Sequence, residues 1–121
     1  MSWQFTADRP IYSQLVEYLS VFIITGSYAA GSRLPSVRDL AGEAKVNPNT
    51  MQRALAELEN MGLVYAERTS GRFVTEDTEM IQATKEKLAQ KRITHFFADM
   101  ENLGIGRHQA LAMAAAGKEL K

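Results

Sequence analysis

The sequence predicts an α+β fold in which three helices and a β-hairpin are followed by two further helices. Apolar residues recur at helical spacing from Ile11 to about residue 25, and again in two short segments that begin near Ser36 and Asn47. After Gly62 the spacing changes to that of two short strands. Because the two short helices are joined by a tight turn and lead into a hairpin, the pattern indicates a winged helix-turn-helix.

Capping residues set the expected bounds of the first two helices. Pro10 suits the position just before a helix, and Gly26 is a suitable stop for the same helix. Ser36 and Asp39 are three residues apart, as in a capping box, so the second helix should begin there. We expect that helix to end near Lys45.

The third helix should begin at an Asn47 cap, because Pro48 lacks the N–H that the first helical position leaves unpaired. Its buried stripe then consists of Met51, Ala54, Leu55 and Leu58. The strands should cover roughly residues 63–67 and 72–75, with residues 68–71 at the hairpin tip. A short edge strand is expected at the N-terminus, where apolar residues alternate with polar ones at Trp3 and Phe5.

The first turns of the third helix carry polar groups that a buried helix does not need. Asn49, Gln52 and Arg53 are three and four residues apart and therefore share one face. In the DNA major groove, amides match adenine and arginine matches guanine, while Thr50 can reach a phosphate or a thymine methyl group. Two glutamates in the second half of the helix would be repelled by phosphates. We therefore expect only its N-terminal half to enter the groove.

Cations from separate segments can line the same face. The formal net charge is +0, so nucleic-acid binding must rest on local charge. Arg33 and Arg38 lie before and within the second helix, and Arg68 and Arg72 flank the hairpin tip. Each arginine alone fits an ordinary solvated surface, but the combined pattern favours a nucleic-acid interface.

Several ordered blocks between Gly26 and Val74 resemble the DNA-binding domain of the GntR family of bacterial transcription regulators. PIYSQL at residues 10–15 and the VNPNT turn resemble the YtrA-like branch of that family. The resemblance implies a dimeric repressor on an inverted repeat. Gln52 stands where many members have arginine, so we expect Arg53 to supply that contact. The matching blocks are Gly31…Arg33-Leu34-Pro35-Ser36…Arg38…Leu40, then Thr50…Ala54-Leu55…Leu58…Gly62-Leu63, and Gly71…Phe73-Val74.

The family contacts that the resemblance implies are carried by the second helix, the start of the third helix and the wing. They add Asn47 and Gly71 to the residues named above, and Ser70 lies beside Gly71 at the wing tip. The complete candidate set for DNA binding is Arg33, Arg38, Asn47, Asn49, Thr50, Gln52, Arg53, Arg68, Ser70, Gly71 and Arg72.

The remaining sequence predicts a dimerisation region. A long helix should begin with Asp77 or Thr78 as its cap and end at Gly104, and an alanine-rich helix should cover about residues 107–116. Two helices cannot enclose a core of their own, so a second copy should cover them. We divide the chain into a DNA-binding domain at 1–76 and a helical dimerisation region at 77–121. The expected interface residues are Ile81, Leu88, Ile93, Phe96, Phe97, Met100, Leu103 and Leu111.

Other functional classes fit less well. The chain has no cysteine and two histidines. A metal site made of His95, Asp99 and His108 has no supporting motif, so we expect no cofactor, no metal and no enzymatic activity. No signal peptide or apolar run of spanning length is present, which favours a cytoplasmic protein without membrane contact.

Two alternatives stay open. A winged helix can also be a protein- or RNA-interaction module without operator specificity, and salt-dependent binding to duplex DNA would separate the two functions. Phe96, Phe97 and Met100 can form either a pocket for an unidentified small-molecule effector or a plain helix interface, and their helical spacing favours the interface.

Overall fold

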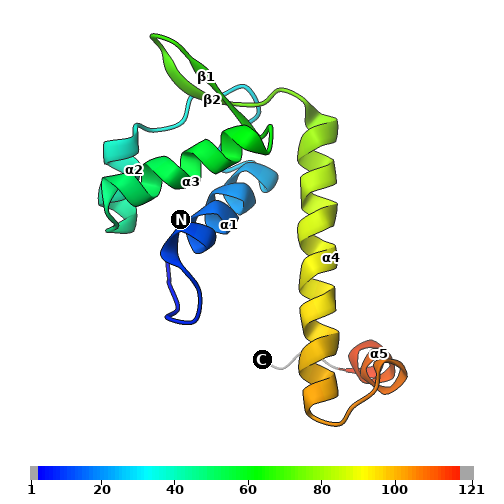
Figure 1. The fold of residues 1–121 in the computed structure, drawn as a ribbon. Coiled ribbons are helices and arrows are strands. Elements are labelled where there is room, and N and C mark those ends of the chain that lie inside the picture. The colour runs from blue at the N-terminus through cyan, green and yellow to red at the C-terminus, as the bar shows by residue number, and fades with distance from the viewer. Residues whose placement is uncertain (1–2, 118–121) are drawn as a thin grey trace. The chain divides into compact units, whose positions relative to one another are not determined.

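A computed structural model describes residues 3–117 of this 121-residue chain (Figure 1). The described residues confirm the predicted α+β fold. The chain divides into two compact units, with the boundary between Lys85 and Glu86. The elements are α1 (Ile11–Ile24), α2 (Val37–Ala44), α3 (Pro48–Asn60), β1 (Val64–Glu67), β2 (Gly71–Val74), α4 (Thr78–Asn102) and α5 (Arg107–Ala116).

The core of the first unit lies between α1, α2, α3 and the hairpin. The predicted stripe of α3 is buried, with Met51, Ala54 and Leu58 at 0% exposure and Leu55 at 1%. Burial of this stripe fixes which face of α3 remains in solvent, because side chains three and four apart lie together. The other large side chains of the core with almost no exposure are Leu15, Leu19, Leu40, Leu63 and Val74.

Local caps hold the two helices of the helix-turn-helix, as predicted. The Asp39 backbone N–H donates to Ser36 Oγ at 3.1 Å, and the Asn49 N–H donates to Asn47 Oδ1 at 2.7 Å. Pro48 occupies the first turn of α3. Lys45 ends α2 in the left-handed region with φ 60°. A residue in this conformation turns the chain away from the helix axis, and α3 can therefore begin soon after α2 ends.

The wing is a two-stranded antiparallel sheet in which Tyr65 pairs with Phe73 and Val64 with Val74. A bridge from Arg33 to Phe73 adds the segment before α2 to the free side of β2. In that segment, the Leu34 N–H donates to the Arg72 carbonyl at 2.8 Å. The wing is therefore tied by backbone hydrogen bonds to the loop that leads into the helix-turn-helix.

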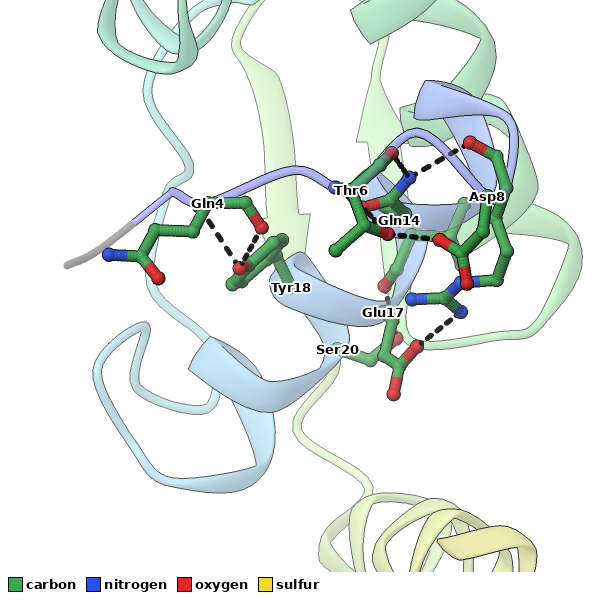
Figure 2. Close-up of polar contacts among 9 residues, drawn as sticks. Gln4, Thr6, Asp8, Gln14, Glu17, Tyr18 and Ser20 are labelled. Carbon is green, nitrogen blue, oxygen red and sulfur yellow. Dashed lines mark hydrogen bonds and ion pairs between the residues drawn. The ribbon is translucent and has the colours of Figure 1, made fainter. Parts of the chain in front are cut away.

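The expected edge strand around Trp3 and Phe5 is wrong, because these residues form no strand in the described chain. Side chains of α1 form hydrogen bonds with the backbone groups of this segment instead (Figure 2). The Gln4 N–H donates to the Tyr18 hydroxyl at 3.0 Å, and that hydroxyl donates to the Gln4 carbonyl at 2.5 Å. Sequence alternation alone could not distinguish strand pairing from pairing with helix side chains.

The last two helices have the predicted bounds. Asp77 caps α4, since its Oδ1 accepts from the backbone N–H groups of Glu79 and Met80 at 3.1 Å each. None of the 25 residues of α4 is fully buried. In α5, Ala110 is buried at 1% exposure.

Candidate nucleic-acid interface

The exposed side of α3 begins with the predicted polar cluster. Asn49, Gln52 and Arg53 are exposed, and Thr50 is half-buried. The Asn47 cap uses its side-chain oxygen, so the amide NH₂ is the part of this residue that can face DNA. The first two turns of α3 therefore present amide and guanidinium donors to solvent. The buried face of the same helix holds it in place against the core.

Arg53 contacts Tyr12, a residue that no pattern in the sequence indicated. Its guanidinium Cζ lies over the Tyr12 ring, 4.2 Å from the ring centroid. Tyr12 is in the first turn of α1 and is half-buried. No spacing rule could have paired these residues, since the contact depends on how α1 packs against α3.

The cations before and within α2 are exposed. Arg38 is the second residue of α2, close to the cap at Ser36. Arg33 lies along the wing, and a Cβ at Gly71 would come within 3.1 Å of the Arg33 Nε. Gly71 has φ 106°, a conformation that favours glycine. Glycine at this position therefore serves both the backbone conformation and the close approach of Arg33.

The wing tip does not present all four predicted residues equally. Arg68 and Ser70 are exposed in the turn between the strands. The Arg72 Nε, by contrast, donates to Glu59 Oε2 at 3.2 Å, with the two side chains 20% and 29% exposed. Side chains alternate along a strand, so Arg72 shares the face of buried Val74 and points towards α3.

The predicted dimerisation residues have different environments. Ile81 packs against the core of the first unit. Phe97 lies under the Arg107 guanidinium, with its ring centroid 4.4 Å from Cζ, and it also contacts Phe96 at 5.4 Å between centroids. Leu88, Phe97 and Met100 are half-buried. The exposed members of the set are Ile93 at 46%, Phe96 at 37%, Leu103 at 70% and Leu111 at 50%.

Residues 3–117 contain no group of three or more His, Cys, Asp or Glu side chains that could hold a metal ion. Within the same residues, no helix is both long enough and apolar enough to cross a bilayer.

The chain is similar to known bacterial regulators along most of its length. The family model described as bacterial regulatory proteins, gntR family, matches residues 11–74. The HTH-type transcriptional regulator YhcF of Bacillus subtilis is 35% identical over 111 residues, which cover 92% of each chain. The transcriptional repressor YtrA of the same organism is 32% identical over 104 residues, 86% of this chain and 75% of YtrA.

A solved structure is also similar. The GntR family transcriptional regulator from Listeria monocytogenes superposes with a TM-score of 0.84 at 38% identity, covering 94% of this chain and 100% of that one. This protein therefore belongs to the GntR family, and it is a DNA-binding transcription regulator, not an enzyme.

Proposed function

We propose that this protein is an operator-binding repressor that acts as a homodimer on an inverted repeat. The observation that carries the proposal is the start of α3, where exposed Asn49, Gln52 and Arg53 lie opposite a buried stripe. Recognition helices of helix-turn-helix proteins contact bases mainly through their N-terminal residues. The first two turns of α3 have the side chains for this role.

Each side chain of the interface has a proposed role. The amides of Asn49 and Gln52 suit adenine, and the guanidinium of Arg53 suits guanine. Thr50 and the NH₂ group of Asn47 lie at the helix start, where phosphate contacts fix the register. The cations and wing-tip groups proposed to contact the backbone are Arg33, Arg38, Arg68, Ser70 and Gly71.

Arg72 receives a different role in this proposal. Its ion pair with Glu59 joins the wing to the second half of α3. The pair also neutralises one of the two glutamates that would otherwise face phosphates. Arg72 therefore supports the orientation of the wing, and its contribution to DNA affinity should be indirect.

We further propose that residues 1–76 bind DNA and residues 77–121 make the dimer, although Ile81 also packs on the winged helix. At 1.5 Å per residue, α4 is about 37 Å long, and it has no fully buried residue. A two-fold partner would cover the exposed apolar side chains of α4 and α5. Two recognition helices would then lie about 34–36 Å apart, one turn of DNA.

Dimerisation would also supply affinity that one winged helix lacks. Joining two DNA-binding units makes the second contact intramolecular, which raises avidity by about 10²–10⁴. Occupation of a promoter by such a dimer would block transcription, and YtrA, which is similar over 86% of this chain, is described as a repressor. We assign this activity to the cytoplasm, where bacterial DNA is located.

The proposal is tested by selecting DNA from a random duplex pool with the full chain and sequencing what is retained. We expect an enriched inverted repeat whose half-sites are one helical turn apart, bound by two chains in sedimentation. Affinity should fall steeply between low and moderate salt because phosphate contacts release counterions. An enriched site without symmetry, or one chain bound per site, would count against the dimer proposal.

A further inference from the structure

We propose that Tyr12 is a positioning residue for DNA recognition: its ring face holds the Arg53 guanidinium on the exposed side of α3. The inference rests on the proposed function, because it explains how the same helix places one of its reading groups. Tyr12 itself need not touch DNA.

The contact joins two elements that the core fixes relative to each other. The Arg53 Cζ lies 4.2 Å from the centroid of the Tyr12 ring. Leu15, one turn after Tyr12, has 0% exposure, and so does Ala54, the residue after Arg53. Both backbones are therefore held where their side chains meet, and the ring is a fixed platform for a long, flexible side chain.

The hydrogen-bonding groups of Arg53 remain available. Among residues 3–117, its guanidinium makes no hydrogen bond or ion pair. Glu57 is four residues later on the same helix, at the spacing that favours an ion pair, yet no such pair forms there. Attraction to a ring face uses the charge of the guanidinium and leaves N–H donors for a base or a phosphate.

Arg72 shows the opposite arrangement. Its Nε is committed to Glu59 at 3.2 Å, and its side chain is 20% exposed. Arg53 is exposed and is held by an aromatic ring in place of a carboxylate. Of these two arginines, Arg53 is thus the one that is both oriented and free to donate.

Hydrogen bonds of Gln14 hold the first turn of α1, which carries Tyr12, to the segment before it (Figure 2 shows the bonds of Gln14). Gln14, only 2% exposed, donates its Nε2 to the carbonyls of Thr6 at 2.8 Å and Arg9 at 2.9 Å. Its Oε1 accepts from the Thr6 N–H at 2.8 Å. These bonds tie the segment before the helix to the first turn of α1, and a helix end held in this way is less free to fray.

A pre-placed arginine loses less rotamer freedom when it binds, so removal of the platform should weaken DNA binding. At a site where the cation is exposed, its attraction to a ring face corresponds to about a two- to fivefold change in affinity for each half-site. Tyr12→Leu should show this loss. Tyr12→Phe keeps the ring face and should bind the selected DNA almost as well as the parent.

A double-mutant cycle tests the coupling with the DNA that the full chain selects. Tyr12→Leu should weaken binding in the parent and have almost no effect in Arg53→Ala, because the platform then has nothing to hold. Tyr12→Met is a second replacement that lacks the ring, and the same cycle with this variant should give the same result. Tyr18→Leu is the matched control on α1, and its effect should be the same in both backgrounds. Thermal melting of every variant shows that the compared proteins are folded.

Base preference gives a readout that a purely structural role would not move. Repeating the selection with Tyr12→Leu should relax the same base-pair position that Arg53→Ala relaxes, and leave the other positions unchanged. Equal losses from Tyr12→Leu in both backgrounds would overturn the inference. An Arg53→Ala protein with full affinity would overturn it too. In either case an enriched inverted repeat would leave the proposed function intact, whereas a pool without any enriched motif would remove both.

Discussion

Replacement of Leu55 by alanine tests whether the buried face of α3 is structural. Leu55 is 1% exposed in the core that α3 shares with α1 and α2, so truncation leaves a cavity. Such changes cost about 2–5 kcal/mol of unfolding free energy. Met51 lies one turn earlier and can adjust into part of the space, so we expect about 3 kcal/mol.

Thermal and urea unfolding followed by circular dichroism measure this loss. In a domain of this size each kcal/mol corresponds to roughly 4–8 °C, so the melting temperature should fall by about 12–24 °C. Gln52→Ala is the matched control, because Gln52 is exposed on the same helix and its replacement should change stability by less than about 0.5 kcal/mol.

The reasoning fails if Leu55→Ala melts within a degree or two of the parent. The apolar stripe of α3 would then not be buried as described, and the polar face opposite it could not be assigned to DNA. The affinity of Leu55→Ala for the selected DNA, measured well below its melting temperature, should be close to that of the parent. Gln52→Ala should show the reverse pattern, with normal stability and weaker binding.

Four further predictions address the interface, the helix cap, a buried hydroxyl and the dimer. If Arg38 reads a base, it should contribute about 1–3 kcal/mol to binding of the selected DNA, and Arg38→Ala should lose this without a change in melting temperature. Lys91→Ala removes an exposed cation of α4 and is the control. An equal loss of affinity in Lys91→Ala would show that the Arg38→Ala loss reflects only the missing positive charge. Asn47→Ala should lose the cap, costing about 0.5–2 kcal/mol, and also lose DNA affinity, whereas Asn47→Asp should keep the stability and lose only affinity; unchanged binding in both variants would argue against an Asn47 contact. Burial, followed by the charge of Glu43, raises the pKa of Tyr28, and the buried Tyr28 hydroxyl has no hydrogen-bond partner among the described residues. Stability should therefore decline as the pH rises above about 10, the ordinary tyrosine value, and Tyr28→Phe should reduce that decline without destabilising the protein at pH 7; titration of unfolding against pH checks both signs. A chain ending at Lys85 should keep a folded winged helix but be monomeric and bind the inverted repeat about 10²–10⁴-fold more weakly, and a dimeric truncated chain in sedimentation would refute the assignment of α4 and α5.

The sequence by itself determined the helices, the two strands of the wing and the order in which they occur, but not the structure of the segment around Trp3 and Phe5. Ser36, Asn47 and Pro48 carry their structural information locally, because a cap or a fixed φ acts on backbone groups within three residues. The same holds for Asp77 at the start of α4. Periodicity then determined which side of α3 is buried, and with it the three exposed polar residues of its first turns.

Only the tertiary structure decided what the long side chains contact. It placed Arg53 over Tyr12 and paired Arg72 with Glu59, although both arginines look alike in the sequence. It also directed the backbone groups of Gln4 to a side chain of α1 and not to a strand. Such partners are distant along the chain and meet only because the core sets the positions of α1, α3 and the wing. A local pattern contains no record of that packing, so it could identify the cations without showing which of them remain free.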